Sequence, residues 1–183
     1  NIEKALYVNE RTIAKDLPGD FLDNLLLKEA YRTESNFNEE VKVKDLEQAR
    51  INLFGKNYEI IIPTDKEVGS CPVFKYNTEK RSYKRDSSEC NITNDISISY
   101  DVVEARIIEN KSITIYEAVA FIKDDKIYKK IDGSNNVSDE VKDVTTDGFN
   151  VLDNVKKLNQ YKYTFTYDKD SNNYVFNSIE LVK

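Results

Sequence analysis

The spacing of apolar residues changes from a helical period to a strand period close to residue 57. Before that point, apolar side chains recur about every 3.6 residues, the pattern of helices with one buried face. Beyond it, apolar and polar residues alternate, the pattern of strands with one buried face. Helices followed by antiparallel strands predict an α+β fold in a single domain, residues 1–183. We expect residues 1–57 to be the helical part and residues 58–183 to form the sheet on which the helices pack.

Turn and capping residues divide the helical part into three expected helices. The dipeptide Pro18-Gly19 ends the first, and Asp20 can cap the second. The third is expected from Val43 to Phe54, with Gly55 directly after its last turn.

One strand of the sheet region changes its buried face halfway along. Ile98, Tyr100 and Val102 alternate with polar residues, but the apolar phase then resumes at Val103. A single inserted residue that reverses the face predicts a β-bulge, which bends a long strand. Further strands follow along the chain, so we expect a curved, bulged antiparallel meander with a concave face.

The C-terminal hairpin carries alternating aromatic residues. If Tyr167 faces Tyr174 across the hairpin, Phe165 faces Phe176. Such a ladder is usually the core face of a sheet, but tyrosines on a concave face can also line a ligand pocket. The residues assigned to this core ladder or pocket are Tyr100, Tyr116, Tyr163, Phe165, Tyr167, Tyr174 and Phe176.

The composition argues against several classes of site. Without histidine, Ser–His–Asp and Cys–His catalysis are excluded, and with two cysteines a zinc site is not expected. The five glycines are far apart, so no phosphate-binding loop is expected. A net charge of −6 argues against nucleic-acid binding, and no apolar run is long enough to span a membrane. We therefore predict no catalytic residue, no metal and no cofactor.

Acid–base catalysis without histidine stays open as an alternative, because the chain has 33 carboxylate side chains. Asp101, Glu104 and Glu117 lie on the central strands. A carboxyl group among them that points into the concave face would be a candidate base, since burial raises its pKa.

The two cysteines, Cys71 and Cys90, enclose 18 residues that have the pattern of a hairpin. They would meet where the strands enter and leave it, so we predict a disulfide that stabilises the fold by about 3 kcal/mol. The alternative is a reactive thiol, but neither a CxxC spacing nor a histidine is present. A structural disulfide predicts an extracytoplasmic domain, secreted or membrane-anchored. Because the chain begins at Asn1 rather than Met, we expect a targeting segment upstream.

Four basic residues cluster within this hairpin, namely Lys80, Arg81, Lys84 and Arg85. They can form a patch that binds anionic wall polymers or headgroups. They can also be the solvated tip of a hairpin that resists edge-to-edge aggregation. Acidic neighbours dilute the positive charge, which favours the second interpretation.

Residues 168–172 match the start of a calcium-binding loop. The match then fails, because the sixth position is Asn173 rather than Gly and the twelfth is Ile179, where a bidentate Glu is required. A polar hairpin turn explains the same residues, and we predict a turn.

Several short strings carry a resemblance to a known group of domains. They are Leu53-Phe54-Gly55-Lys56-Asn57, the run from Cys71 to Asn77, Tyr83, Cys90, Tyr163-Thr164-Phe165 and Tyr174-Val175-Phe176. Over roughly Asp45 to Lys183, the chain resembles uncharacterised exported domains of low-GC Gram-positive bacteria, which resemble a cystatin-like, nuclear-transport-factor-like cone. The resemblance implies a surface location and supplies no catalytic residue.

These observations predict an extracytoplasmic, non-catalytic binding or interaction domain of a membrane-anchored or secreted bacterial protein. Its expected ligand is a cell-surface molecule, a wall polymer or a protein. One alternative is a small-molecule-binding protein or a histidine-independent acid–base enzyme that uses the interior of the cone. Another is a secreted inhibitor or host-interaction factor.

Overall fold

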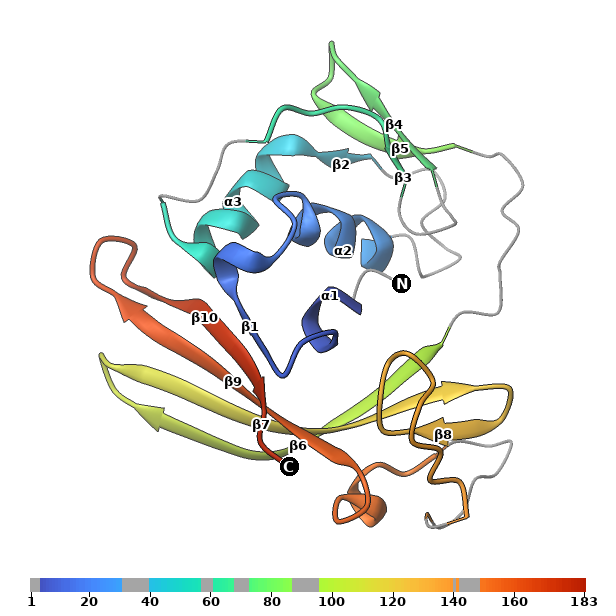
Figure 1. Ribbon diagram of the computed structural model, residues 1–183. Helices are drawn as coiled ribbons and strands as arrows, with labels where there is room; N and C mark the ends of the chain where they lie inside the picture. Colours follow the sequence, from blue (N-terminus) through green and yellow to red (C-terminus); the bar gives the residue numbers. More distant parts are fainter. Residues whose placement is uncertain are drawn as a thin grey trace.

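The computed structural model describes residues 4–30, 40–56, 61–67, 73–86, 96–139, 141 and 149–183 (Figure 1). Cys71 and Cys90 lie outside these residues, so the disulfide stays a prediction. The helical elements are α1 (Lys4–Tyr7), η1 (Ala14–Asp16), α2 (Phe21–Ala30), α3 (Val43–Phe54) and η3 (Leu152–Asn154), where η marks a 3₁₀ turn. The strands are β1 (Arg11–Ile13), β2 (Val41–Lys42), β3 (Lys66–Glu67), β4 (Val73–Asn77), β5 (Ser82–Arg85), β6 (Ser97–Ile108), β7 (Ser112–Lys123), β8 (Lys126–Tyr128), β9 (Asn159–Asp168) and β10 (Asn173–Leu181).

The strands of the described chain form two antiparallel sheets. The larger sheet has the order β1-β10-β9-β7-β6, and β8 pairs with the far end of β7. The smaller sheet has the order β2-β5-β4-β3. In Figure 1 the smaller sheet lies at the top and the larger one at the bottom, with α2 and α3 between them. No helix in the described residues is long and apolar enough to cross a membrane.

The predicted fold class, N-terminal helices packed on one curved meander in a cystatin-like cone, is wrong. Strand accounts for 44% of the structure and helix for only 20%, and the strands belong to two sheets. The difference arises because distant segments pair, with Arg11 opposite Glu180 and Val41 opposite Tyr83. The two strands that contain these N-terminal residues, β1 and β2, lie in the part predicted to be helical. Apolar spacing reports only the local period, so it could not reveal strands whose partners are far away in the chain.

The individual helix predictions have mixed outcomes. The first expected helix is wrong beyond α1, because β1 and η1 occupy the residues before Pro18. The second and third agree with α2 and α3. The third ends at Gly55, whose φ of +83° favours glycine and whose N–H donates to the carbonyl of Ile51.

Two predictions about the larger sheet are confirmed. The register between β6 and β7 shifts between Val102 and Glu104, where the bulge was expected. In the β9–β10 hairpin, Tyr167 lies opposite Tyr174 and Phe165 opposite Phe176. The sheet is therefore bent at the middle of its outer strand and carries aromatic pairs at its other end.

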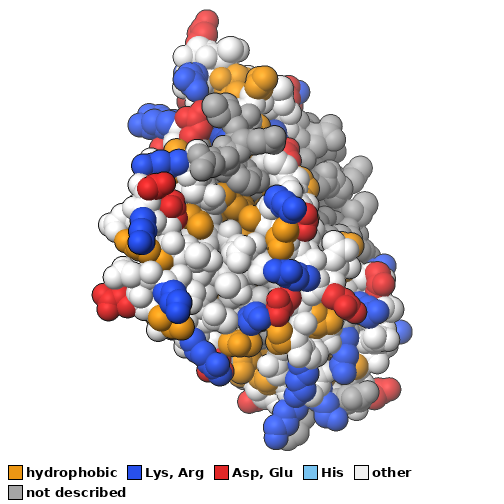
Figure 2. All heavy atoms as spheres, turned by 60° about the vertical axis from the view of Figure 1, so that its left-hand side comes forward, with side chains coloured by type: hydrophobic (Ala, Val, Ile, Leu, Met, Phe, Trp, Pro, Cys, Tyr) orange, Lys and Arg blue, Asp and Glu red, His pale blue; other side chains and the backbone are white. Residues whose placement is uncertain are grey.

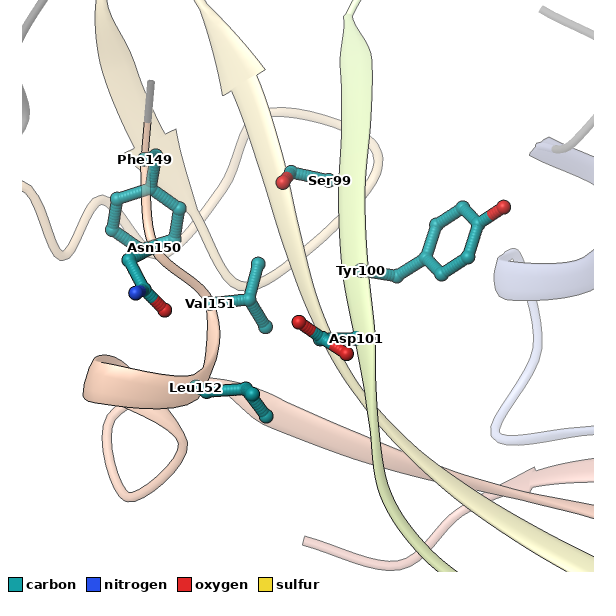
Figure 3. A pocket seen from close by; sticks show the side chains of 7 residues that line it. All are labelled: Ser99, Tyr100, Asp101, Phe149, Asn150, Val151 and Leu152. Carbon is teal, nitrogen blue, oxygen red and sulfur yellow. The ribbon is translucent and has the colours of Figure 1, made fainter. Parts of the chain in front are cut away.

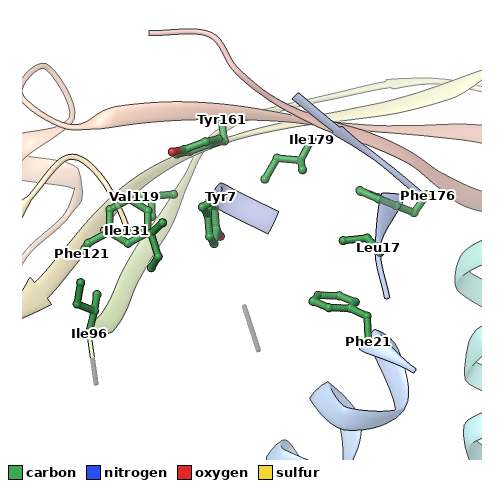
Figure 4. Packing of buried hydrophobic residues seen from close by; sticks show 10 residues of the cluster. All are labelled: Tyr7, Leu17, Phe21, Ile96, Val119, Phe121, Ile131, Tyr161, Phe176 and Ile179. Carbon is green, nitrogen blue, oxygen red and sulfur yellow. The ribbon is translucent and has the colours of Figure 1, made fainter. Parts of the chain in front are cut away.

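Apolar residues pack on both faces of the larger sheet. We call the face that carries Val119 and Phe121 the helix-side face, since Tyr7 of α1 packs on it (Figure 4). The opposite face, which we call the outer face, carries Ala118 and Ala120 and is covered by residues that include Val137, Val151 and Leu158. A third cluster joins Leu27 and Leu46 of the helices to Phe74 and Tyr83 of the smaller sheet.

An ion pair is buried beside the smaller sheet. Asp23 of α2 lies 3.0 Å from Arg50 of α3, and both side chains are buried. Nearby, the buried ammonium group of Lys66 in β3 lies 3.2 Å from the carboxylate of Asp20. Removing one partner of a buried pair such as Asp23–Arg50 typically costs about 3–5 kcal/mol, so this contact fixes α2 and α3 relative to one another.

Candidate functional site

The outer strand β6 exposes an unusual amount of apolar surface. It pairs with β7 along one edge, and the described residues place no strand along its other edge. Of the nine large apolar side chains exposed in the described chain, five belong to β6, namely Tyr100, Val102, Val103, Ile107 and Ile108. Tyr100 is 61% exposed and Ile107 is 70% exposed. Single exposed apolar residues are common, but a concentration on one strand indicates a contact surface.

The register places two of these residues, Tyr100 and Val102, next to one carboxyl group, that of Glu117. Val102 lies opposite Glu117 on β7, and Glu117 lies opposite Tyr161 on β9. Tyr100 lies opposite Val119, two residues further along the same helix-side face. Glu117 is thus an acidic residue at a position where Ile115, Val119 and Phe121 are apolar, which places it at the border between the buried and exposed parts of this face.

A chain of hydroxyl groups leads from Glu117 into the core. The Glu117 carboxyl group and the Tyr163 hydroxyl are hydrogen-bonded, and the Tyr163 and Tyr7 oxygens are 2.8 Å apart. When Glu117 is ionised, its carboxylate only accepts hydrogen bonds, so the Tyr163 hydroxyl donates to Glu117 and the Tyr7 hydroxyl donates to Tyr163. When Glu117 holds a proton, either tyrosine oxygen can be the donor between the two. The ring of Tyr7 also packs edge-on against the ring of Tyr161, with the ring centres 4.9 Å apart, and Figure 4 shows the two side by side.

Burial dominates the electrostatics of this cluster. It raises the pKa of Glu117, and the nearby charge of Asp101 raises that pKa further, whereas the hydrogen bond from Tyr163 lowers it. Burial also raises the pKa of Tyr7 and of Tyr163, so both phenols stay protonated near neutral pH. In the described part of the chain, no Lys or Arg pairs with Glu117. The cluster can therefore either hold a proton on Glu117 or neutralise a positive group that approaches it.

The outer face carries a separate, open depression of about 400 Å³ (Figure 3). Ser99 and Asp101 point into it, whereas the ring of Tyr100 points to the other side of β6. The remaining wall comes from the segment around η3, and the lining residues are Ser99, Tyr100, Asp101, Phe149, Asn150, Val151 and Leu152. The Asp101 carboxylate accepts a hydrogen bond from the backbone N–H of Val102 at 2.9 Å. Among the described residues that line it, this depression has a carboxylate but no inward tyrosine hydroxyl.

The predicted aromatic ladder is divided between the two faces of the larger sheet. The rings of Tyr167 and Tyr174 are 5.4 Å apart, and those of Phe165 and Phe176 are 5.7 Å apart. Tyr163 precedes Phe165 on β9 and lies on the same helix-side face. Tyr100 lies on this face at the outer strand, away from the hairpin.

Tyr116 lies on the other side of the sheet. It is opposite Glu104, and Arg106 lies over its ring at 5.6 Å. Glu104 forms an exposed ion pair with Arg106, so of the three candidate bases only Glu117 faces the helix side. The ladder is therefore partly core and partly the border of the exposed surface.

Acidic residues from elsewhere in the chain lie next to the predicted basic patch. Lys80 lies 2.8 Å from Glu40, and Arg81 lies 3.4 Å from Glu47 of α3. The hydrogen bond from Lys80 lowers the pKa of Glu40, and the charge of Lys84 lowers it further. Arg85 is the last residue of β5, on the same hairpin. At the top of Figure 2, over this hairpin, acidic and basic side chains appear together.

The residues around Asp168 form a turn. Asp168 accepts hydrogen bonds from the backbone of Asp170 and from the hydroxyl of Ser171, at 3.2 and 2.6 Å. Residues 169–172 join β9 to β10, as the turn prediction expects. Across the described residues, no group of acidic, Cys or His side chains has the arrangement of a metal site.

Sequence reasoning missed Tyr7, which lies in a stretch expected to be one continuous helix. Nothing in the local pattern connects it to Tyr163, which is 156 residues away. Glu117 did carry a signal, because it interrupts an alternation that otherwise reserves this face of β7 for apolar residues. Comparison with protein-family models, with curated proteins and with solved structures finds no match.

Proposed function

We propose that this chain is an extracytoplasmic, non-catalytic binding domain that takes its ligand on β6 and the adjoining helix-side face. The observation that carries this proposal is the concentration of exposed apolar side chains on one outer strand. The ligand is a protein or another cell-surface molecule. Contact with such a surface would cover Tyr100, Val102 and Ile107, which are otherwise exposed.

The form of β6 favours recognition through its side chains. A long, flat edge strand invites pairing with any other strand, and bulges and charged residues are the usual protection against this. β6 has both, because its bulge lies at Val102–Glu104 and Arg106 and Glu104 carry charges. The strand is therefore poorly suited to indiscriminate edge pairing, while its apolar side chains on the helix-side face remain available to a specific ligand.

The proposed location rests on the cysteines. Disulfides persist in oxidising compartments and are rare in the cytoplasm. The β4–β5 hairpin between Cys71 and Cys90 supports the proposed disulfide, because Phe74 lies opposite Arg85 and brings the two strands side by side.

A second candidate function is small-molecule binding, or acid–base chemistry without histidine, at Glu117. One observation favours it, because an inward carboxyl group is linked to the hydroxyls of Tyr163 and Tyr7. The depression of about 400 Å³ does not contribute to this cluster, since it opens on the outer face.

Site-specific photo-crosslinking in the producing cell tests the proposed function. A photoreactive amino acid at Ile107 should give a discrete adduct of higher mass. The same residue at Val8, which is 65% exposed but lies outside the larger sheet, should not. Equal labelling from both positions, or none from Ile107, would refute β6 as the contact strand.

A further inference from the structure

Glu117 is a partly buried carboxyl group, and no positive charge among the described residues compensates it. In the described part of the chain its side-chain partner is the hydroxyl of Tyr163, and the charged group that acts on it is the acidic Asp101. Removing a carboxylate from water is costly unless a cation or several hydrogen bonds replace the lost hydration. Glu117 nevertheless lies on the face of β7 where its neighbours Ile115 and Val119 are apolar.

Aromatic residues are neighbours of this carboxyl group on the adjacent strands. Tyr161 lies opposite Glu117 on β9, and Tyr163 donates its hydrogen bond. On the other side, Tyr100 extends from β6 on the same face and is exposed. Aromatic rings beside a carboxylate attract positive groups through their negative faces. Val102, opposite Glu117, adds an apolar contact for an alkyl chain.

We propose that this cluster binds an alkylammonium group, with Glu117 as its counter-ion and Tyr100 and Val102 as the walls that contact its alkyl chain. The inference rests on the proposed function, because it names the chemical group that the helix-side face recognises. Two sources share this chemistry, a free amine and a lysine side chain of a protein ligand.

The geometry favours ammonium over other cations. A guanidinium group is bound best when both carboxylate oxygens accept in parallel, but Glu117 already accepts a hydrogen bond from Tyr163. A divalent metal requires several oxygen ligands, and the described residues provide no such group of acidic side chains. An ammonium group requires one charged acceptor and tolerates aromatic and apolar neighbours.

The test follows the tyrosine ring resonances of ring-labelled protein by NMR at pH 8 while n-butylammonium is added. Saturable shifts confined to the cluster are expected, and n-butanol, which is neutral and of similar length, should produce none. A short lysine peptide and its norleucine counterpart distinguish the two sources. If only the lysine peptide binds, the ligand is a protein; if the free amine binds equally well, it is a small molecule.

Two variants locate the effect. Glu117→Gln keeps a hydrogen-bond acceptor for Tyr163 but removes the charge, and should weaken n-butylammonium binding about tenfold or more. Glu104→Gln is the matched control, because Glu104 lies in the same sheet but on the outer face, where it pairs with Arg106. It should leave binding unchanged. The circular dichroism spectrum of each variant shows that the fold is retained.

Three outcomes would overturn the inference: equal shifts with n-butanol, undiminished binding by Glu117→Gln, or no saturable binding of either ammonium probe. An adduct from Ile107 in the crosslinking experiment would then still support β6 as the contact strand. If ammonium binding and the Ile107 adduct are both absent, the proposed function is refuted as well.

Discussion

The hydroxyl oxygens of Tyr7 and Tyr163 lie 2.8 Å apart, although 156 residues separate them in the chain. This contact links α1 to β9, a central strand of the larger sheet. It also orients the hydroxyl of Tyr163 toward Glu117. The N-terminal segment is thus part of the candidate site, and its attachment can be measured.

Replacing either tyrosine with phenylalanine should destabilise the protein. Each single variant removes one hydroxyl and leaves its partner without that bond, so each should cost about 1 kcal/mol in urea unfolding. The double variant should cost clearly less than the sum, because the hydrogen bond can be lost only once. Tyr100→Phe is the control, since that side chain is exposed, and should change stability by less than about 0.5 kcal/mol. Strict additivity would show that the two hydroxyls do not interact.

The charge of Glu117 should make stability depend on pH in an unusual direction. Burial raises its pKa in the folded state, so the folded protein holds this proton more tightly than the unfolded chain does. The resulting contribution is fully present below the unfolded pKa and is lost as pH rises through the folded pKa. Glu117→Gln should therefore be more stable than the parent at pH 7, and the difference should shrink in acid.

Glu104 provides a comparison of the opposite sign. The hydrogen bond and charge of Arg106 lower its pKa, so its contribution is present above the unfolded pKa and is lost as pH falls through the folded one. Because Glu104 is exposed, Glu104→Gln should change stability only slightly at any pH. Thermal melts of both variants and the parent from pH 4 to pH 8 measure these effects. A Glu117→Gln variant that is less stable than the parent at pH 7 would contradict a raised pKa of Glu117 in the folded protein.

Alkaline titration should separate the tyrosines into two groups. Burial raises the pKa of Tyr83 to about 12 and also raises those of Tyr7, Tyr161 and Tyr163. In denaturant, all 12 tyrosines should ionise near their ordinary pKa of about 10. In the native protein these four should stay neutral until the fold opens, because their contribution to stability is lost only as pH rises through the raised values. Absorbance near 295 nm follows the ionisation, and full ionisation near pH 10 with an unchanged far-ultraviolet circular dichroism spectrum would be inconsistent with their burial.

The predictions that succeeded depend on short-range patterns. The bulge at Val102–Glu104 follows from a phase change within one strand, and the pairing of Phe165 with Phe176 follows from one turn. α3 is specified by its apolar stripe and by Gly55. In each case the sequence that determines the element is contiguous, so its period and turn residues contain the information.

The predictions that failed involve pairing between distant segments. β1 has only three residues and becomes a strand because β10, at the other end of the chain, offers it a free edge. β2 has two residues and joins the smaller sheet through Tyr83 and Ser82. Segments this short have no measurable period, so tertiary contacts decide their conformation. The connection of Glu117 to Tyr7 was missed for the same reason, since it depends on where α1 lies on the sheet.

The predicted disulfide between Cys71 and Cys90 can be tested without a ligand. The strands that flank the hairpin tip are paired, with Phe74 opposite Arg85, so Cys71 lies three residues before one member of that pair and Cys90 five residues after the other. A bond between them would close a loop of about twenty residues, for which chain entropy predicts a stabilisation of roughly 3 kcal/mol. Mass spectrometry of protein from the native compartment, alkylated after denaturation without reductant, should show no modified thiol. Cys71→Ser and Cys90→Ser should each lower the free energy of unfolding by about the same 3 kcal/mol, and the double variant should lower it no further. Two alkylated cysteines in the parent protein would exclude the disulfide and remove the main support for an extracytoplasmic location.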